Sequence, residues 1–329
     1  MSRIPLYTAY RSDLMAKSRE FRAILAGLML LLVGFTAIAG ADPKLRTDHR
    51  KRSIPTEIRK WPSKSSPERQ KADFEADIRF QGVLKGMGSR FGSEAVVRTR
   101  YFRLAGDLSR EERTRLGTLL DGQVRRMNER RGASIDDEPF PTRIGVFAAG
   151  SRDRFQLLEA GQFDRFAPSD RVAGLHIEGS TLLISVDFTA VRGRLDYQLS
   201  RAVAEAWLYG FGTNRPLPAW AEEGFAAATA WSETPPGTGY GRREAIESVR
   251  RGRGLEDLLL LEEEWSPNSS DEGRAGLLME RLLDRPDTLF AWFDAVKAGE
   301  PWRQAFERIF ESTPEELVDY TVRWYRVND

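Results

Sequence analysis

One segment, residues 195–228, limits what this chain can fold into more than any other. It reads LDYQLSRAVAEAWLYGFGTNRPLPAWAEEGFAAA. Its first part has apolar residues at helical spacing, namely Leu195, Leu199, Ala202, Val203 and Ala206. This spacing predicts a helix with one buried face. Arg201 and Glu205 lie one turn apart on the same side of that helix, close enough to form an ion pair.

The second part of the segment carries a more specific pattern, L-P-x-W-x-x-E-G-x-A. Its members here are Leu217, Pro218, Trp220, Glu223, Gly224 and Ala226. In this pattern the chain resembles the gluzincin zinc metallopeptidases, above all the bacterial peptidase MA-like group. Those proteins carry H-E-x-x-H on the preceding helix. Aligned on that motif, this chain has Arg201 and Glu205 at the two histidine positions and Ala202 at the glutamate position.

These replacements remove the chemistry that the resemblance implies. Two histidines at i and i+4 and a carboxylate from the next helix hold zinc and leave a fourth place for water. The metal lowers the pKa of that water to about 7, and the motif glutamate takes its proton. Arginine has no acceptor for a metal, and alanine cannot take a proton. We therefore expect no catalytic residue, no metal and no cofactor at the degenerate positions Arg201, Ala202, Glu205 and Glu223.

The residues that remain suggest an electrostatic replacement. We expect the guanidinium of Arg201 to lie where the metal would lie, between the carboxylates of Glu205 and Glu223, so that one cation replaces another. The alternative is a solvated ion pair on a helix surface, worth only about 0.3 to 0.5 kcal/mol. The sequence leaves both open. They differ in burial, because a buried arginine depends on its partners.

No other residue supplies the lost imidazoles. The chain has two histidines, His49 and His176, and no cysteine, so a thiolate zinc site is excluded. His176 lies in a predicted strand before the motif helix. It either approaches the site or, the interpretation we favour, packs or forms hydrogen bonds on the sheet.

The N-terminus predicts export. Basic residues precede an apolar run from Ala23 to Ala39, and small residues at 37, 39 and 41 offer cleavage sites. We favour a cleaved signal peptide over residues 1–41. An uncleaved membrane anchor is the alternative, although the run is short for a span of about 20 residues. Either way, the body is expected in the periplasm or at the cell surface.

A basic stretch follows, over residues 42–73, and predicts a disordered linker. Residues 1–73 hold 15 Lys and Arg against 7 Asp and Glu, a net charge of +8, whereas the whole chain carries +1. The remainder therefore carries −7, which argues against nucleic acid as its partner. Membrane contact through the N-terminal segment is a minority interpretation of the basic stretch.

The remainder predicts an α+β fold, with a strand-rich lobe over residues 74–190 packed on a helical lobe over 191–329. Expected strands cover 95–104, 143–148, 172–177 and 181–188, the last two forming a hairpin at Gly179 and Ser180. Expected helices cover 109–127, 151–160, 242–251, 255–265, 275–283, 288–298, 302–310 and 315–325. Capping boxes at Ser109 to Glu112 and Thr313 to Glu316 begin two of them. The order of elements is also that of the peptidase MA-like group. That group often has a tyrosine just before the helix at 275–283, and Ser269 to Gly273 has none.

These patterns predict an exported, catalytically inactive relative of the peptidases, acting as a binding or scaffold module. An extended peptide or protein in the cleft between the lobes would add to an edge strand, for which we expect Thr181 to Phe188. The alternative is an active hydrolase or metallopeptidase with a rebuilt carboxylate site. Asp196, Glu205, Glu222 and Glu223 would then gather Mg, Mn or Ca, or a carboxylate pair would act without metal. A third hypothesis is a chance match in an unrelated protein. The oligomeric state is not predicted.

Overall fold

A mixed five-stranded sheet forms in the first half of the chain, and helices follow it. The computed structural model describes residues 66–88, 96–134, 138–165, 167–212, 217–234, 240–252, 255–260 and 269–327. They all belong to one compact unit, Ile54–Asp329. In this part of the chain every strand lies between residues 97 and 187. The structure is thus a mixed α/β fold. In the described residues the strands are confined to the first half, where helices alternate with them, and the second half is helical.

The first described helix, α2 (Pro67–Gly86), is not among the helices that the sequence analysis expects. The hydroxyl of Ser66 accepts a hydrogen bond from the backbone N–H of Arg69 at 3.1 Å, and Pro67 occupies the first helical position. The helix buries Phe80 and Val83 against the sheet. The prediction of a disordered linker is therefore wrong for residues 67–73, while residues 42–65 lie outside the described part.

The sheet has the strand order β1-β2-β3-β5-β4. Its members are β1 (Val97–Arg98), β2 (Phe102–Gly106), β3 (Ile144–Ala149), β4 (Ala173–Glu178) and β5 (Thr181–Asp187). The three central strands are parallel, and the outer strands β1 and β4 are antiparallel to their neighbours. The single strand predicted over 95–104 is wrong. Asp121 accepts hydrogen bonds from the backbone N–H groups of Arg100 and Tyr101, which holds a turn between β1 and β2.

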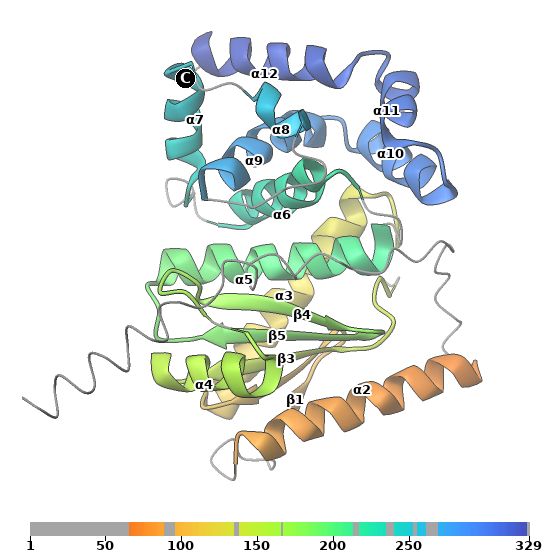
Figure 1. The fold of residues 1–329 in the computed structure, drawn as a ribbon. Coiled ribbons are helices and arrows are strands. Elements are labelled where there is room, and N and C mark those ends of the chain that lie inside the picture. The colour runs from red at the N-terminus through yellow and green to blue at the C-terminus, as the bar shows by residue number, and fades with distance from the viewer. Residues whose placement is uncertain are drawn as a thin grey trace, which may run out of the picture. The chain divides into compact units, whose positions relative to one another are not determined.

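Helices cover both faces of the sheet, so alternate residues of the central strands β2, β3 and β5 are buried on opposite sides. On one face α3 (Arg110–Arg130) and α5 (Arg192–Trp207) pack against Val146 and Ile184. On the other, α2 and α4 (Arg152–Phe163) pack against Phe147 and Leu183. Figure 1 shows α5 above the sheet with α2 and α4 below it. The predicted capping box at the start of α3 is confirmed, with Ser109 and Glu112 bonding each other's backbone.

The predicted hairpin of β4 and β5 is confirmed, with Gly179 at φ 59° in its turn. The expectation that Thr181 to Phe188 forms the sheet edge is wrong. Strand β5 lies between β3 and β4, so β4 is the edge strand. Only one strand of this hairpin lies at the sheet edge, because the other pairs with β3. The pattern of apolar residues did not show which strand takes which place.

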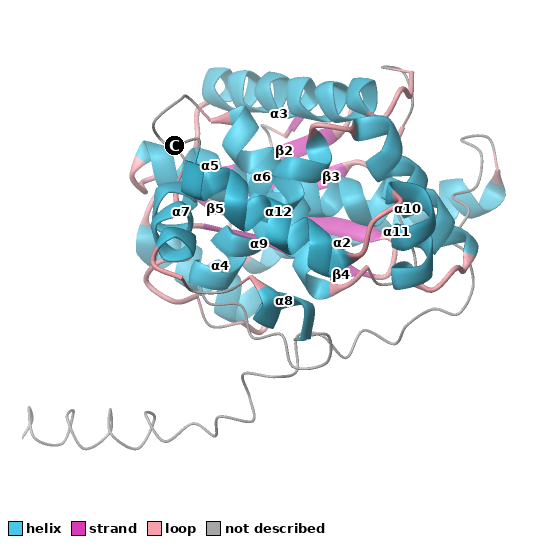
Figure 2. Cartoon of the chain, turned by 90° about the horizontal axis from the view of Figure 1, so that it is seen from above, coloured by secondary structure: helices cyan, strands magenta, loops and turns pink. Residues whose placement is uncertain are grey.

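The second half of the described chain is helical. After α5 comes a π-helical turn, η4 (Leu208–Gly212). The remaining helices are α6 (Ala219–Glu233), α7 (Arg242–Arg250), α8 (Glu256–Leu260), α9 (Ser269–Leu283), α10 (Pro286–Ala298), α11 (Trp302–Phe310) and α12 (Pro314–Val327). Seen from above, α6, α9 and α12 lie over the strands (Figure 2). The capping box of Thr313 and Glu316 is confirmed. None of the described helices is long and apolar enough to cross a membrane, and the run 23–39 lies outside them.

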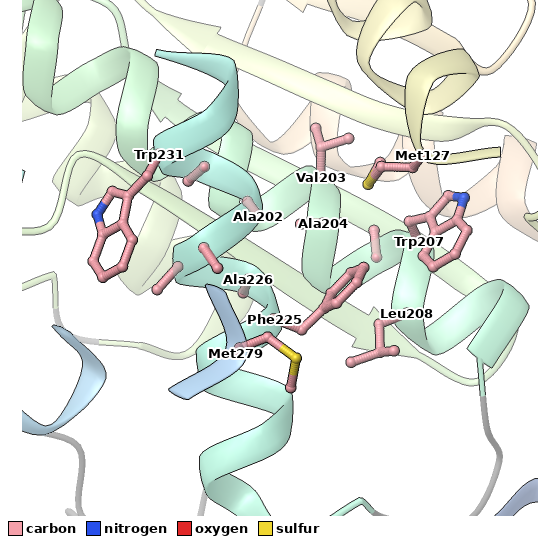
Figure 3. Packing of buried hydrophobic residues seen from close by; sticks show 14 of the residues in the cluster. Met127, Ala202, Val203, Ala204, Trp207, Leu208, Phe225, Ala226, Trp231 and Met279 are labelled. Carbon is pink, nitrogen blue, oxygen red and sulfur yellow. The ribbon is translucent and has the colours of Figure 1, made fainter. Parts of the chain in front are cut away.

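The helices α6 and α9 approach each other closely because glycines line their contact. A methyl group at Gly224 would lie 2.4 Å from the carbonyl oxygen of Ala275, and one at Gly276 would lie 2.4 Å from the ring of Trp231. Around this contact, side chains of α3, α5, α6 and α9 form one core (Figure 3). Within it, the rings of Trp207 and Phe225 stack with their centroids 5.6 Å apart. The glycine of the E-G pattern therefore sets the distance between two helices.

We predict that Gly224→Ala destabilises the protein by about 1–3 kcal/mol, because the new methyl group meets the backbone of α9. Gly82 in α2 is the matched control, since a methyl group there would have no neighbour within 4 Å. Gly82→Ala should stabilise by up to about 1 kcal/mol, the difference in helix propensity. Urea denaturation measures both. Equal effects of the two substitutions would contradict this packing.

Candidate functional site

Three helices bring charged side chains together around Arg201. Helix α5 supplies Arg201 and Glu205, α6 supplies Glu223, and α9 supplies Glu272. The spacing on α5 brings the first two together, and the close approach of α6 to α9 brings the others. The sequence analysis names three members of this cluster and misses Glu272. We call these four residues the Arg201 cluster.

The guanidinium of Arg201 contacts all three carboxylates. Its Nη1 donates a hydrogen bond to Oε2 of Glu272 at 3.0 Å, and its Nη2 donates to Oε2 of Glu223. Its Nε lies 3.2 Å from Oε1 of Glu205, an ion-pair distance without the alignment of a hydrogen bond. These contacts join α5, α6 and α9 through one side chain, an arrangement that an isolated surface pair does not have.

The cluster lies largely inside the protein. The side chain of Arg201 is 19% exposed, that of Glu223 10% and that of Glu272 20%, while Glu205 at 35% faces solvent most. Ala202, the next residue on α5, is 3% exposed within the apolar core. The solvated surface pair considered above therefore does not describe Arg201. The alternative of a largely buried arginine that depends on its carboxylate partners describes it.

Burial and charge oppose each other at these groups. Burial lowers the pKa of Arg201, but the carboxylates of Glu223, Glu205 and Glu272 outweigh it and raise this pKa well above the ordinary arginine value. For Glu272, burial is the largest influence and raises the pKa, with a further rise from Glu223 and Glu205 and a partial offset from Arg201. Arg201 thus stays charged, and the charged form of Glu272 is the costly one. Burial also raises the pKa of the neighbouring Tyr197.

Glu272 lies in the segment Ser269 to Gly273, which the sequence analysis compares with a tyrosine-bearing segment of the peptidase MA-like group. The sequence analysis notes that Ser269 to Gly273 lacks that tyrosine, but it does not ask what replaces it. Nothing in the local spacing places α9 beside α5, because their contact depends on packing through α6.

The carboxylates named for a rebuilt cation site do not all join this cluster. Asp196 forms an ion pair with Arg192 on its own helix, with Oδ1 2.9 Å from Nε. Glu222 is the residue before Glu223 on α6 and is partly exposed. Among the described residues, no group of three or more histidine, aspartate and glutamate side chains is arranged to hold a metal ion.

His176 lies on the opposite face of the sheet from α5. It pairs across the strands with Leu183, which packs against α2 and α4. Its Nε2 is 2.8 Å from Oε1 of Glu159 and 3.0 Å from the hydroxyl of Ser185. The interpretation of a hydrogen-bonded histidine on the sheet is confirmed. A serine–histidine–carboxylate triad uses both ring nitrogens, whereas here both partners contact Nε2. His49 lies outside the described residues.

The edge strand β4 is partly covered by side chains. The backbone oxygen of Val172 accepts a hydrogen bond from Asp187, so by alternation the backbone groups of Ala173 and Leu175 point away from β5. The N–H of Ala173 donates to Oε1 of Gln198 at 3.2 Å. The carbonyl of Leu175 accepts from Nη1 of Arg165 at 3.1 Å. A strand that adds to this edge must displace these contacts or pair beyond Leu175.

Two comparisons of the chain with known proteins found no match. No model of a known protein family matches the chain, and no curated protein matches it. The functional argument therefore depends on the residues and their geometry.

We predict that Glu223→Ala lowers the free energy of unfolding by roughly 2–3 kcal/mol, because it removes a hydrogen bond between buried charges and leaves Arg201 short of a partner. The control is Glu111→Ala, which removes an exposed i,i+4 partner of Arg115. That change should cost at most about 0.5 kcal/mol. Chemical denaturation of both variants tests the prediction, and a loss at Glu223 no larger than at Glu111 would contradict it.

A second prediction concerns pH and Glu272. Because its pKa is raised in the folded protein, this group favours folding at low pH. That contribution is lost as pH rises from about 4.3, the ordinary glutamate value, through the folded pKa. The stability of the natural protein relative to Glu272→Gln should therefore fall as pH rises. Urea denaturation of both proteins between pH 4 and 8 measures this difference. A difference that stays constant or rises would show that Glu272 is not so perturbed.

Proposed function

We propose that this chain is an exported, catalytically inactive protein of the gluzincin, peptidase MA-like type that acts as a binding or scaffold module. The observation that carries the proposal is the position of Arg201. Its guanidinium contacts Glu205 and Glu223, and the resemblance makes these three positions the zinc ligands of a working peptidase. A fixed positive charge in this place satisfies the carboxylates that would otherwise bind a metal.

The order of elements supports the same proposal. Strands and helices lead through the hairpin of β4 and β5 into α5, and α6 follows with the L-P-x-W-x-x-E-G-x-A pattern at its start. Three residues of that pattern have a physical role here. Trp220 is 1% exposed and stacks on Trp292, Gly224 admits α9, and Glu223 binds Arg201.

The edge strand β4 supports a binding role. An extended peptide or protein segment can add to a sheet edge through main-chain hydrogen bonds. Strand β4 is such an edge, whereas β5, which the sequence analysis expects at the edge, is not. The net charge of −7 on residues 74–329 disfavours nucleic acid as the partner. The N-terminal segment would place this module outside the cytoplasm, either released after cleavage or held by an anchor.

Restoring two zinc ligands tests the proposal directly. Arg201→His with Glu205→His recreates histidines at i and i+4 beside Glu223 and leaves the buried Ala202 unchanged. We predict that the natural chain purifies without stoichiometric zinc and does not cleave casein, and that the double variant binds one zinc per chain. Adding Glu223→Ala should weaken that binding at least about tenfold.

Elemental analysis and zinc titration make the comparison, with Arg201→His alone as the control. Circular dichroism establishes that each variant is folded. Stoichiometric zinc in the natural chain would overturn the inactive assignment. A folded double variant that binds zinc no better than the single variant would overturn the derivation from a zinc site.

A further inference from the structure

A buried polar cluster fastens the edge strand to the helix beneath it. His176 on β4 is 2% exposed, and Glu159 on α4 and Ser185 on β5 are fully buried. Nε2 of His176 faces both Oε1 of Glu159 and the hydroxyl of Ser185, and that hydroxyl donates to the same Oε1. The imidazole also stacks on the ring of Phe163, with centroids 3.6 Å apart and an interplanar angle of 7°. Through His176, β4 is therefore attached to α4.

The hydrogen bonds assign the proton on the ring. Because Oε1 of Glu159 accepts, Nε2 must carry the hydrogen. The other nitrogen, Nδ1, is buried and has no hydrogen-bond partner. In the neutral ring this leaves one acceptor unsatisfied. In the protonated ring it would leave a charged donor unsatisfied in a buried place, which is much more costly.

The charges around the ring come from several elements. Burial is the largest influence and lowers the pKa of His176, Glu159 opposes it, and Arg165 and Arg171 in the segment between α4 and β4 lower it further. From α2, Arg79 lies over the Phe163 ring and pairs with Glu178 of β4. Ser185 is the only polar group that β5 adds to the hydrogen-bonded cluster among the residues described. The balance keeps the imidazole neutral.

We propose that His176 is a proton-operated latch on the edge strand β4. With a neutral imidazole it fastens β4 to α4, and protonation below neutral pH loosens β4 from the sheet. The latch goes beyond the proposed binding role and holds whether or not a peptide adds to this edge.

The loosening is confined to β4 because of its place in the sheet. As an edge strand it has one strand neighbour, β5, whereas β3 has two. Its other attachments are the apolar packing of Leu175 and Ile177 on the core, the ion pair of Glu178 with Arg79, and side-chain contacts to its backbone such as those of Arg165 and Gln198. Elements with few neighbours open at a lower free energy than the core. A positive charge on the buried His176 is therefore relieved by local opening of β4.

The direction of the pH effect follows from the lowered pKa. A histidine whose pKa is depressed in the closed state contributes stability above about pH 6.5, its ordinary value, and that contribution is lost as pH falls toward the folded pKa. In this window, opening of β4 should increase by up to about tenfold for each pH unit.

The composition of the chain makes the proton assignment easy to measure, because His49 is the only other histidine. In the full chain with His49→Gln, one imidazole remains for NMR. We expect its ring signals to titrate below about pH 6.5, with ring ¹⁵N shifts of the Nε2–H tautomer. Titration at or above that value, or the Nδ1–H tautomer, would overturn the proposal.

Hydrogen exchange tests the latch itself. Amide exchange of β4 and β3 is measured at pH 7.5 and 5.5, each corrected for its intrinsic rate. In the natural chain and in His49→Gln, we expect β4 opening to rise on acidification while β3 stays protected. In His176→Gln the pH dependence should disappear. Unchanged protection of β4 in the natural chain, or pH-dependent opening that survives in His176→Gln, would contradict the latch. The natural chain and the His49 control decide the matter even when His176→Gln does not fold.

Discussion

A guanidinium kept from water must find acceptors for its N–H groups, and this constraint organises the helical half of the protein. Arg201 meets it with carboxylates from α5, α6 and α9. Removing water from one arginine and three glutamates is costly, and the cost is recovered only while all partners stay in place. The position of α9 beside α6, which Gly224 permits, is therefore also an electrostatic requirement. A shift of either helix would leave buried charge without a partner.

The two faces of the sheet carry polar clusters of different chemistry. On the α5 face, the Arg201 cluster binds its own carboxylates through a permanent cation. On the opposite face, the neutral imidazole of His176 holds β4, and in the proposed latch this attachment is lost when the ring gains a second proton at acidic pH. The first arrangement is insensitive to pH at the arginine, and its positive charge disfavours a metal ion at the same carboxylates. The second places a titratable group under the strand at which a partner would add. Under the proposed function, the Arg201 cluster would keep the helices fixed while the edge strand adjusts to a partner.

Much of this fold could be predicted from local sequence. The apolar spacing of α5, the capping boxes at Ser109 and Thr313 and the hairpin turn at Gly179 all depend on residues close in sequence, and each forms as expected. The pairing of Arg201 with Glu205 is equally local. The contact with Glu223 was anticipated only through the resemblance to gluzincins. Without that resemblance, the spacing of charges on α5 predicts no more than a helix-surface pair.

The features that escaped prediction depend on packing between distant segments. Asp121 on α3 creates the turn that separates β1 from β2, and the strand pattern around that turn gives no sign of it. The choice of β4 as the edge depends on which strand pairs with β3. Glu272 reaches Arg201 because α9 packs on α6, across a segment that is far away in sequence. Each of these features depends on a contact between segments far apart in sequence, and the local sequence pattern does not indicate it.

The central claim is that the guanidinium and the carboxylates depend on one another, and a double-mutant cycle measures this directly. Arg201→Met, Glu223→Gln and the combined variant are unfolded in urea beside the natural chain. The account predicts that the combined loss differs from the sum of the single losses by about 2 kcal/mol, as for charges in direct buried contact. Losses that add to within about 0.5 kcal/mol would contradict it, because they would show two residues that do not interact.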